Sequence, residues 1–197
     1  MTKRFDRDGG STKYHIQTFC AMKHFDFNLV NSFSYEQLFQ TLRELNMSYT
    51  VAEQLFRRMV FNVLARNCDD HTKNFEFRLK KEDKWELAPA YDVCHAYQPK
   101  HPWVSKHALS INGKRTNITK DNLLTNGKSI KNKKAAATID EINKTVKKWK
   151  SFAEETEVTP KLRNEIAATL IQLQLVVVIR LITFEKHILR LSFYFPS

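Results

Sequence analysis

Acidic, amide, histidine and lysine side chains crowd into one short stretch of this sequence, residues 67–74, which reads NCDDHTKN. Within it, Asp69 and Asn74 precede two short alternating segments that predict an antiparallel hairpin, and Asp92 follows the second of them. Because a hairpin returns the chain to where it began, residues on its two flanks meet at one end. We therefore expect these two carboxylates and one amide to share a site.

An all-oxygen set of this kind suits Mg²⁺, a hard cation that prefers carboxylates, water and substrate phosphates. The spacing from Asp69 to Asn74, with Lys73 beside it, is that of the catalytic loop of protein kinases. In that loop an Asp accepts the proton of the substrate hydroxyl and an Asn holds Mg²⁺, while a second Asp beyond a hairpin completes the metal site. Asp92 has this last position, although His71 follows the candidate base instead of preceding it.

Three stretches, in their relative order, resemble the HipA-type bacterial serine/threonine-protein kinases, the toxins of type II toxin–antitoxin systems: KRFDR, NCDDHTKNF and LAPAYDV. The resemblance covers about residues 1–170 and implies a mainly α-helical, protein-kinase-like C-lobe that contains a small β-hairpin. It implies an enzyme that transfers the γ-phosphate of ATP to a serine of a protein target, such as an aminoacyl-tRNA synthetase. ATP and Mg²⁺ would be its cofactors, and a HipB-like antitoxin with DNA would be its partner.

The same resemblance implies a role for each candidate residue in the loop and after the hairpin. Asp69 would be the catalytic base, and Asn74 and Asp92 would bind Mg²⁺. His71 and Lys73 would support the site by shaping the loop or by contacting phosphate.

The KRFDR stretch resembles the hinge between the two kinase lobes. As nucleotide-binding residues, Lys3 and Phe5 would face adenine through their backbone, and Asp6 would lie near the ribose. In this family the N-lobe precedes the hinge, and a kinase needs its phosphate-covering loop and sheet Lys. We therefore expect the N-lobe to be absent and the chain to be inactive alone. It would be a decayed gene fragment, which we favour, or one half of a split kinase whose N-lobe is encoded separately.

The chain divides on this interpretation into a hinge-like remnant at 1–10, a HipA-like kinase C-terminal domain at 11–170 and a divergent tail at 171–197. Hydrophobic periodicity and capping signals predict the elements of the middle segment. They are helices at 32–46, with a Ser34–Gln37 capping box, and at 51–66, with a Thr50–Glu53 box; a hairpin at 75–79 and 84–88; an apolar helical stripe from Ile139 to Phe152; and a helix begun by Thr159-Pro160.

The net charge of +11 is concentrated between residues 100 and 150, where 13 Lys and Arg stand against three Asp and Glu, a local balance of +10. A polyanion such as nucleic acid would bind such a region, but a solvated helix face has the same composition. One alternative to a kinase is therefore a non-catalytic module that binds DNA or an antitoxin partner through residues 100–150.

A second alternative is a zinc-site protein, because Cys68, His71, Cys94 and His95 supply four ligands of suitable chemistry. Against it, Cys94 and His95 are adjacent and so point to different sides of an extended chain. The paired Cys-x-x-Cys knuckles of common structural zinc sites are also absent from the sequence. Nothing in the sequence pairs His107 with another residue, and we expect it to be either a surface or a satisfied core side chain.

The remaining features concern the compartment. Three cysteines are too few for a disulfide framework, which favours a reducing environment. The N-terminus is charged, and the apolar run at 175–184 is short and carries Arg180, so we expect neither a signal peptide nor a membrane span. The prediction is a cytoplasmic protein with no membrane partner.

Overall fold

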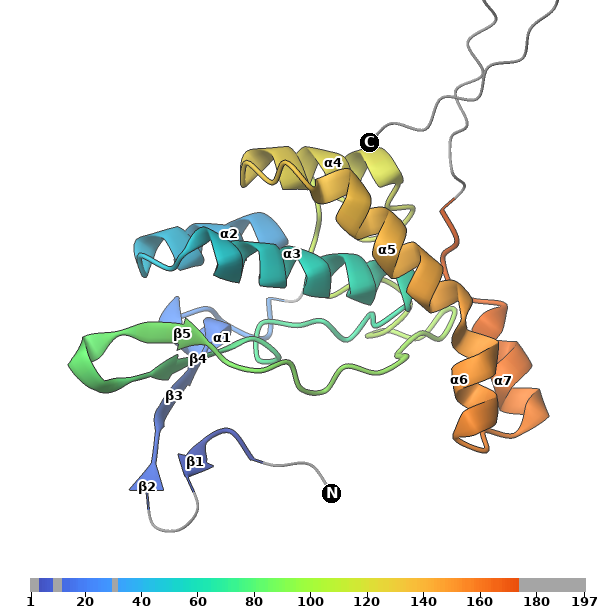
Figure 1. Ribbon diagram of the computed structural model, residues 1–197, viewed down its shortest axis with the longest axis horizontal. Coiled ribbons are helices and arrows are strands. Elements are labelled where there is room, and N and C mark those ends of the chain that lie inside the picture. Colours follow the sequence, from blue (N-terminus) through green and yellow to red (C-terminus); the bar gives the residue numbers. More distant parts are fainter. Residues whose placement is uncertain (1–3, 9–11, 30–31, 174–197) are drawn as a thin grey trace, which may run out of the picture.

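The computed structural model describes residues 4–8, 12–29 and 32–173. In Figure 1 the helices α2 to α5 lie together on one side of a small sheet, and α6 and α7 follow at the end of α5. Within the described ranges, no helix has the length and apolar content needed to cross a bilayer. The helices are α1 (Phe19–Met22), α2 (Tyr35–Glu44), α3 (Tyr49–Leu64), α4 (Lys120–Ser129), α5 (Ala135–Lys147), α6 (Trp149–Glu155) and α7 (Pro160–Ala167). The strands are β1 (Arg7–Asp8), β2 (Thr12–Lys13), β3 (His15–Thr18), β4 (Glu76–Leu79) and β5 (Trp85–Leu87).

The predicted hairpin is confirmed: β4 and β5 pair antiparallel, with Phe77 opposite Leu87. The prediction of a single hairpin was nevertheless incomplete, because it lacked a third strand. β3 pairs with the other edge of β4 and places Gln17 opposite Phe77. The described part of the chain therefore holds a three-stranded antiparallel sheet, together with the short β1–β2 pair. The third strand escaped prediction because it is four residues long and its partner lies about 60 residues away, beyond the reach of local patterns.

The first predicted helix corresponds to α2, and its capping box is confirmed. Gln37 N donates to Ser34 Oγ at 3.2 Å, and Ser34 N donates to Gln37 Oε1 at 2.8 Å. The second predicted helix corresponds to α3, but its Thr50–Glu53 capping box is wrong. The helix begins earlier, at Tyr49, so Thr50 lies inside its first turn and not at its cap.

The predicted stripe from Ile139 to Phe152 is divided between two helices, because α5 ends at Lys147 and α6 begins at Trp149. The part on α5 is buried, whereas Phe152 on α6 is 45% exposed. Thr159-Pro160 begins α7 as predicted, with the proline in the first turn. Of the predicted tail at 171–197, all but residues 171–173 lie outside the described residues.

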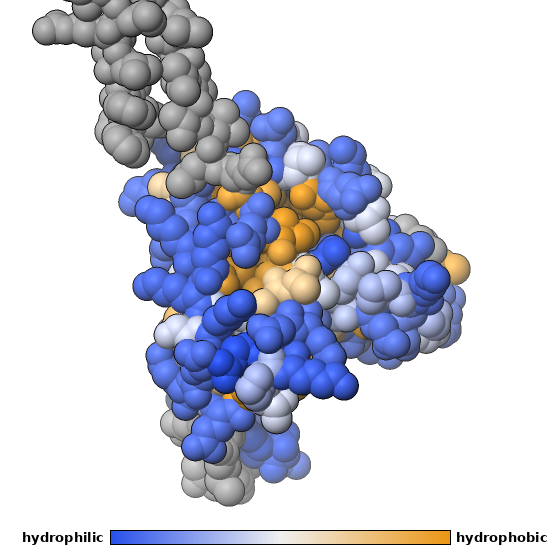
Figure 2. Space-filling model, turned by 90° about the vertical axis from the view of Figure 1, so that its right-hand side faces the viewer, coloured by the Kyte–Doolittle hydropathy of each residue, from blue (hydrophilic) through white to orange (hydrophobic). Residues whose placement is uncertain are grey.

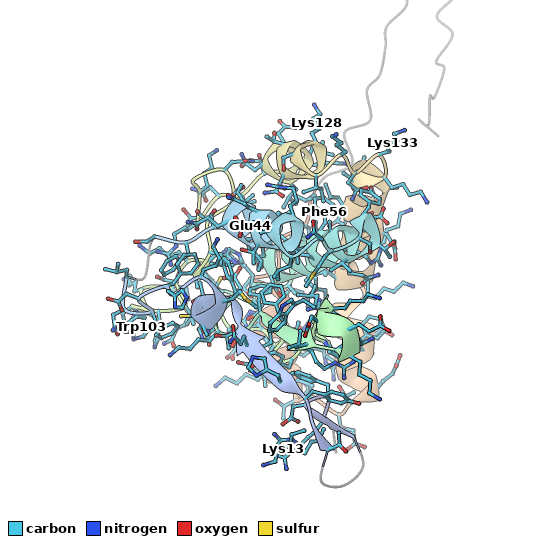
Figure 3. The ribbon with its side chains drawn as sticks, turned by 90° about the vertical axis from the view of Figure 1, so that its left-hand side faces the viewer. Lys13, Glu44, Phe56, Trp103, Lys128 and Lys133 are labelled. Carbon is cyan, nitrogen blue, oxygen red and sulfur yellow. The ribbon has the colours of Figure 1, made fainter. Side chains whose placement is uncertain are left out.

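The core lies around α3, which contacts α2 on one side and α5 on the other. Phe56, Met59 and Val63 on this helix are completely buried, and Phe56 lies well inside the molecule in Figure 3. Gly127 on α4 permits the close approach of its neighbours, because a Cβ there would lie 2.5 Å from the Cβ of Ala135 and 3.3 Å from the Phe56 ring. The helices therefore form a tightly packed layer to which the polar loop before β4 is attached.

A buried polar network attaches this loop to the helical layer. The Asp70 carboxylate is 1% exposed, and it accepts hydrogen bonds from the Tyr35 hydroxyl at 2.8 Å and from the backbone N–H of Ala108 at 2.8 Å. His107 Nδ1 lies 3.0 Å from the same carboxylate. Asn62 on α3 donates to the Tyr35 hydroxyl at 3.0 Å. One carboxylate thus links two helices and the segment before α4 to the loop.

The charge state of this network follows from the pairing of Asp70 with His107. Burial alone would lower the pKa of His107, but the charge of Asp70, the hydrogen bond to it and the contact with Cys68 together raise that pKa to about 10. The imidazole is therefore protonated at neutral pH and forms an ion pair with the carboxylate, both being almost fully buried. His107 is thus a satisfied core side chain, one of the two alternatives that the sequence left open. Its partner Asp70 is distant in sequence and close only in the fold.

Two adjacent aspartates allow a matched test of this network. Asp70→Asn leaves a buried cation without its partner, so we expect it to lower the free energy of unfolding by roughly 3 to 5 kcal/mol. Asp69→Asn makes the same chemical change on a side chain that is 44% exposed, and we expect a change within about 0.5 kcal/mol. Urea unfolding of the two variants measures both values, and equal losses would contradict the structural role assigned to Asp70.

The ion pair also predicts how stability depends on pH. Because the pKa of His107 is raised in the folded chain from its usual 6.5 to about 10, the pair stabilises fully below pH 6.5 and progressively less as the pH rises toward 10. Melting temperatures of the parent chain and of His107→Gln should therefore differ most at about pH 6 and converge at alkaline pH. A difference that stays constant from about pH 6 to alkaline pH would show that His107 is not held protonated.

Candidate functional site

The structure brings together the three residues expected to share a site. The Asn74 side chain joins them: its Nδ2 donates to the backbone carbonyl of Asp69 at 2.8 Å and to the Asp92 carboxylate at 3.3 Å. The Asp69 side chain is 44% exposed, and Asp92 is exposed as well. Within the described residues no hydrogen bond reaches Asn74 Oδ1. Two carboxylates and one amide oxygen are therefore accessible at one end of the hairpin.

The segment after β5 is held against the loop by several contacts. Tyr91 donates its hydroxyl to the carbonyl of Lys73 at 2.5 Å, and Cys68 N donates to the carbonyl of Ala96 at 3.0 Å. Between these contacts Asp92 has a φ of 52°, in the left-handed region that Asp and Asn tolerate better than most residues. This turn directs the chain so that the Asp92 carboxylate reaches Asn74.

His71 and Lys73 both contact the same aromatic ring, that of Phe27. The His71 ring packs edge-on against Phe27 with centroids 5.1 Å apart, and the Lys73 ammonium lies 3.6 Å from the centre of that ring. His71 Nε2 is also 3.9 Å from the Asp69 carboxylate. Both residues thus contact Phe27 and shape the loop, while a contact of either one with phosphate remains a prediction.

Of the three residues assigned to nucleotide binding, Lys3 lies outside the described residues. Phe5 accepts a hydrogen bond on its carbonyl from Arg78 at 3.0 Å, and its ring lies 5.7 Å from that of Tyr91. Asp6 pairs with Arg4 through two contacts of 2.7 and 2.5 Å, and this hydrogen-bonded pairing holds the pKa of Asp6 below its usual value. The Asp6 carboxylate therefore already has a cationic partner.

A cleft of about 940 Å³ connects this N-terminal segment with the residues after the hairpin. Phe5 and Asp6 line one part of it, and Tyr91 and Asp92 line another. The volume lies within the range typical of small-molecule and cofactor sites. The cleft thus brings the hinge-like segment and one of the expected metal ligands to a single cavity.

The four side chains of the zinc hypothesis do not gather. Cys68 is completely buried, whereas Cys94 is exposed, and His95 Nε2 is engaged with the Thr169 hydroxyl at 2.7 Å. In the described part of the chain, no three His, Cys, Asp or Glu side chains form a group able to hold a metal ion. The zinc interpretation is therefore wrong for these residues.

The basic region contains an exposed lysine cluster at the turn between α4 and α5. Its members are Lys128, Lys131, Lys133 and Lys134. Figure 3 shows Lys128 and Lys133 at one end of the molecule, pointing away from it, with Lys13 at the opposite end. Two acids of the region are engaged with other cations, Asp140 with Lys120 and Glu141 with Arg57. Among the described residues, no ion pair involves any of the four lysines.

Sequence reasoning missed Asp70, which adjoins the candidate base. The adjacent pair Asp69-Asp70 was the available signal, because neighbouring residues in an extended segment point to opposite sides. If one of the two side chains faces solvent, the other must therefore face the interior. The partners of that side chain, Tyr35 and His107, had no signal in the sequence at all.

Comparison with solved structures supports the fold. HipA of Shewanella oneidensis MR-1, solved in complex with HipB and its operator DNA, matches with a TM-score of 0.59 and 17% sequence identity. The match covers 87% of this chain and 42% of that HipA chain, so the present chain spans less than half the length of its structural relative. At this identity the likeness shows the fold alone.

The sequence comparisons add the family. No curated protein matches the chain, but a family profile described as the HipA-like C-terminal domain matches residues 1–150. This match covers well over half of the 197 residues, and it includes the loop with Asp69 and Asn74 as well as Asp92. The chain therefore belongs to the family of HipA-like C-terminal domains.

Proposed function

We propose that this chain is the C-lobe of a HipA-like serine/threonine-protein kinase of a type II toxin–antitoxin system. In this proposal ATP binds in the cleft between Phe5 and Asp92 and gives its γ-phosphate to a serine of a protein target, for which an aminoacyl-tRNA synthetase is a candidate. The observation that carries the proposal is the Asn74 side chain, which joins the Asp69 loop to the Asp92 carboxylate at the edge of that cleft.

Each residue of the site has a chemical task in this reaction. Asp69 accepts the proton of the serine hydroxyl, and its partly exposed carboxylate is accessible to a substrate. Asn74 fixes the loop by its bond to the Asp69 carbonyl, so the base is positioned before substrate arrives. His71 and Lys73, held against Phe27, keep the intervening turn in shape.

The donor set fits magnesium. Asp92 offers a carboxylate and Asn74 an amide oxygen that no described residue occupies. A pair of oxygen donors without a complete protein cage suits Mg²⁺, which retains water and binds substrate phosphates. When bound, the ion would neutralise charge on the phosphates.

Other parts of a kinase site must come from elsewhere in this proposal. The 197 residues contain only four glycines and no Gly-rich loop to cover the phosphates. Because phosphoryl transfer depends mainly on positioning and electrostatics, this chain by itself should transfer phosphate slowly or not at all. We propose that an N-lobe would provide the loop and the sheet lysine.

Substitutions of Asp69 and Asp92 should have different effects on nucleotide binding. Asp69→Asn should leave Mg·ATP affinity nearly unchanged, because the base acts on the substrate hydroxyl. Asp92→Asn should weaken Mg·ATP binding by roughly tenfold, because it removes a metal ligand that the nucleotide shares. Calorimetric titration of the chain with Mg·ATP measures both affinities, and no transfer activity is needed for the result.

The transfer step has its own assay. Labelled ATP is incubated with a bacterial lysate and the chain, with and without a HipA N-lobe added as a separate polypeptide. We expect labelled phosphoserine only when the N-lobe is present, and none with Asp69→Asn. Equal Mg·ATP affinity for the parent and Asp92→Asn, or transfer that survives Asp69→Asn, would contradict the roles proposed here.

A second candidate function is binding of a polyanion through the lysine cluster, such as DNA in a complex with a HipB-like antitoxin. The observation that favours it is the exposure of four lysines at one turn, with no ion pair to the described acids. The HipA of Shewanella oneidensis, which shares the fold, was solved together with HipB and operator DNA. The two functions are compatible, because the cluster and the cleft are formed by different elements.

Salt dependence tests the second candidate. Replacing Lys128, Lys131, Lys133 and Lys134 by Gln should weaken binding to duplex DNA and reduce the slope of log affinity against log salt by roughly one for each phosphate that the variant no longer neutralises. The matched control replaces four other exposed lysines, Lys13, Lys80, Lys81 and Lys84, by Gln. Fluorescence anisotropy measures both sets, and an equal loss of affinity in the control would show that only net charge matters.

A further inference from the structure

A second cavity, of about 400 Å³, lies between α3, α5 and the segment that follows β5. Its apolar walls are Phe61 from α3, Ile142 from α5, and Ala90 and Val93 from the segment. Its polar lining consists of Arg57, Arg58, Asn62, Glu141 and Thr145. Figure 2 shows an apolar area framed by polar residues on one face of the molecule. Val93 directly follows Asp92, but the cavity opens on the side of the segment where α3 and α5 pack. The site is therefore distinct from the nucleotide cleft, although Ala90 and Val93 line both.

Arg58 supplies the unpaired charge in this cavity, because the two other charged residues of its lining, Arg57 and Glu141, form an ion pair with each other. Arg58 is partly buried, and its Nη2 donates to the carbonyl of Ala88 at 2.8 Å. Burial lowers the pKa of its guanidinium, and no acid among the described residues offsets that effect. The neighbouring Arg57 differs, because Glu141 binds it through two contacts of 2.8 and 2.6 Å. Arg58 is thus a partly desolvated cation, and its only hydrogen bond within the described structure is to one carbonyl.

A guanidinium has five N–H donors arranged as a planar fork, and a carboxylate matches two of them at once. Removing such a cation from water without a counter-charge is costly, so an anion in the cavity gains more than it would at an exposed arginine. The cavity volume falls within the range of small-molecule sites. Because Arg57 and Glu141 neutralise each other at its wall, the one unpaired guanidinium, that of Arg58, suits a single negative charge on an apolar body.

We infer that this cavity binds a small apolar carboxylic acid. Its carboxylate pairs with Arg58, and its hydrocarbon part packs between Phe61, Ile142 and Val93. The inference rests on the cavity and on Arg58, and it holds whether or not the chain transfers phosphate.

Octanoate is the test ligand, and octan-1-ol of equal chain length is the control for hydrophobic binding. We expect octanoate to bind the full chain about tenfold more tightly than octan-1-ol, since only the acid forms a charge-assisted pair with Arg58. Arg58→Met should abolish this difference. Arg57→Lys, a control on the same helix, should preserve it, because a cation still pairs with Glu141 and the unpaired Arg58 is unchanged.

A filling variant keeps the test valid if Arg58→Met fails to fold. Thr145 lines the cavity and is exposed, so Thr145→Trp should block the cavity and reduce octanoate binding to background while the melting temperature stays near that of the parent. Titrations are followed by calorimetry. Equal affinity for octanoate and octan-1-ol, no saturable octanoate binding, or binding unaffected by Thr145→Trp would each overturn the inference.

Discussion

The buried Asp70 carboxylate is the contact on which the rest of the site depends. A loop rich in polar side chains gains little from apolar burial, so its position must come from directed bonds. Asp70 provides them by accepting from the Tyr35 hydroxyl and the Ala108 backbone and by pairing with His107. Because Asp70 is fixed in place, the residues next to it in the chain are fixed as well. Asp69 is therefore held at the surface with its carboxylate toward solvent.

The same arrangement explains why a rigid helical layer and an exposed polar site occur together. α3 contributes buried apolar side chains to the core and also Asn62, which extends the network to the Tyr35 hydroxyl. On the other side of the loop, Asn74 bonds to the Asp69 backbone and to Asp92. Buried hydrogen bonds thus attach the loop to the helical layer, and the Asn74 amide joins the loop to the segment after the hairpin.

Arg58 and the lysine cluster show two different consequences of a strongly basic chain. The lysines at the α4–α5 turn are exposed, so water solvates them and their charge acts over a surface. Arg58 is partly desolvated beside apolar walls, so its charge acts at short range within one cavity. The net charge of +11 makes both possible, but it does not distinguish a surface patch from a cavity.

The sequence by itself determined the local features: the hairpin, the Ser34–Gln37 capping box, and the grouping of Asp69, Asn74 and Asp92 around the hairpin ends. Each depends on residues close in the chain or on the return of one hairpin, which periodicity and turn geometry report directly. Only the tertiary structure decided that β3 joins the sheet, that His107 pairs with Asp70 and that Arg58 faces a cavity. These contacts join segments far apart in sequence, and burial, which sets their strength, exists only once the chain has folded.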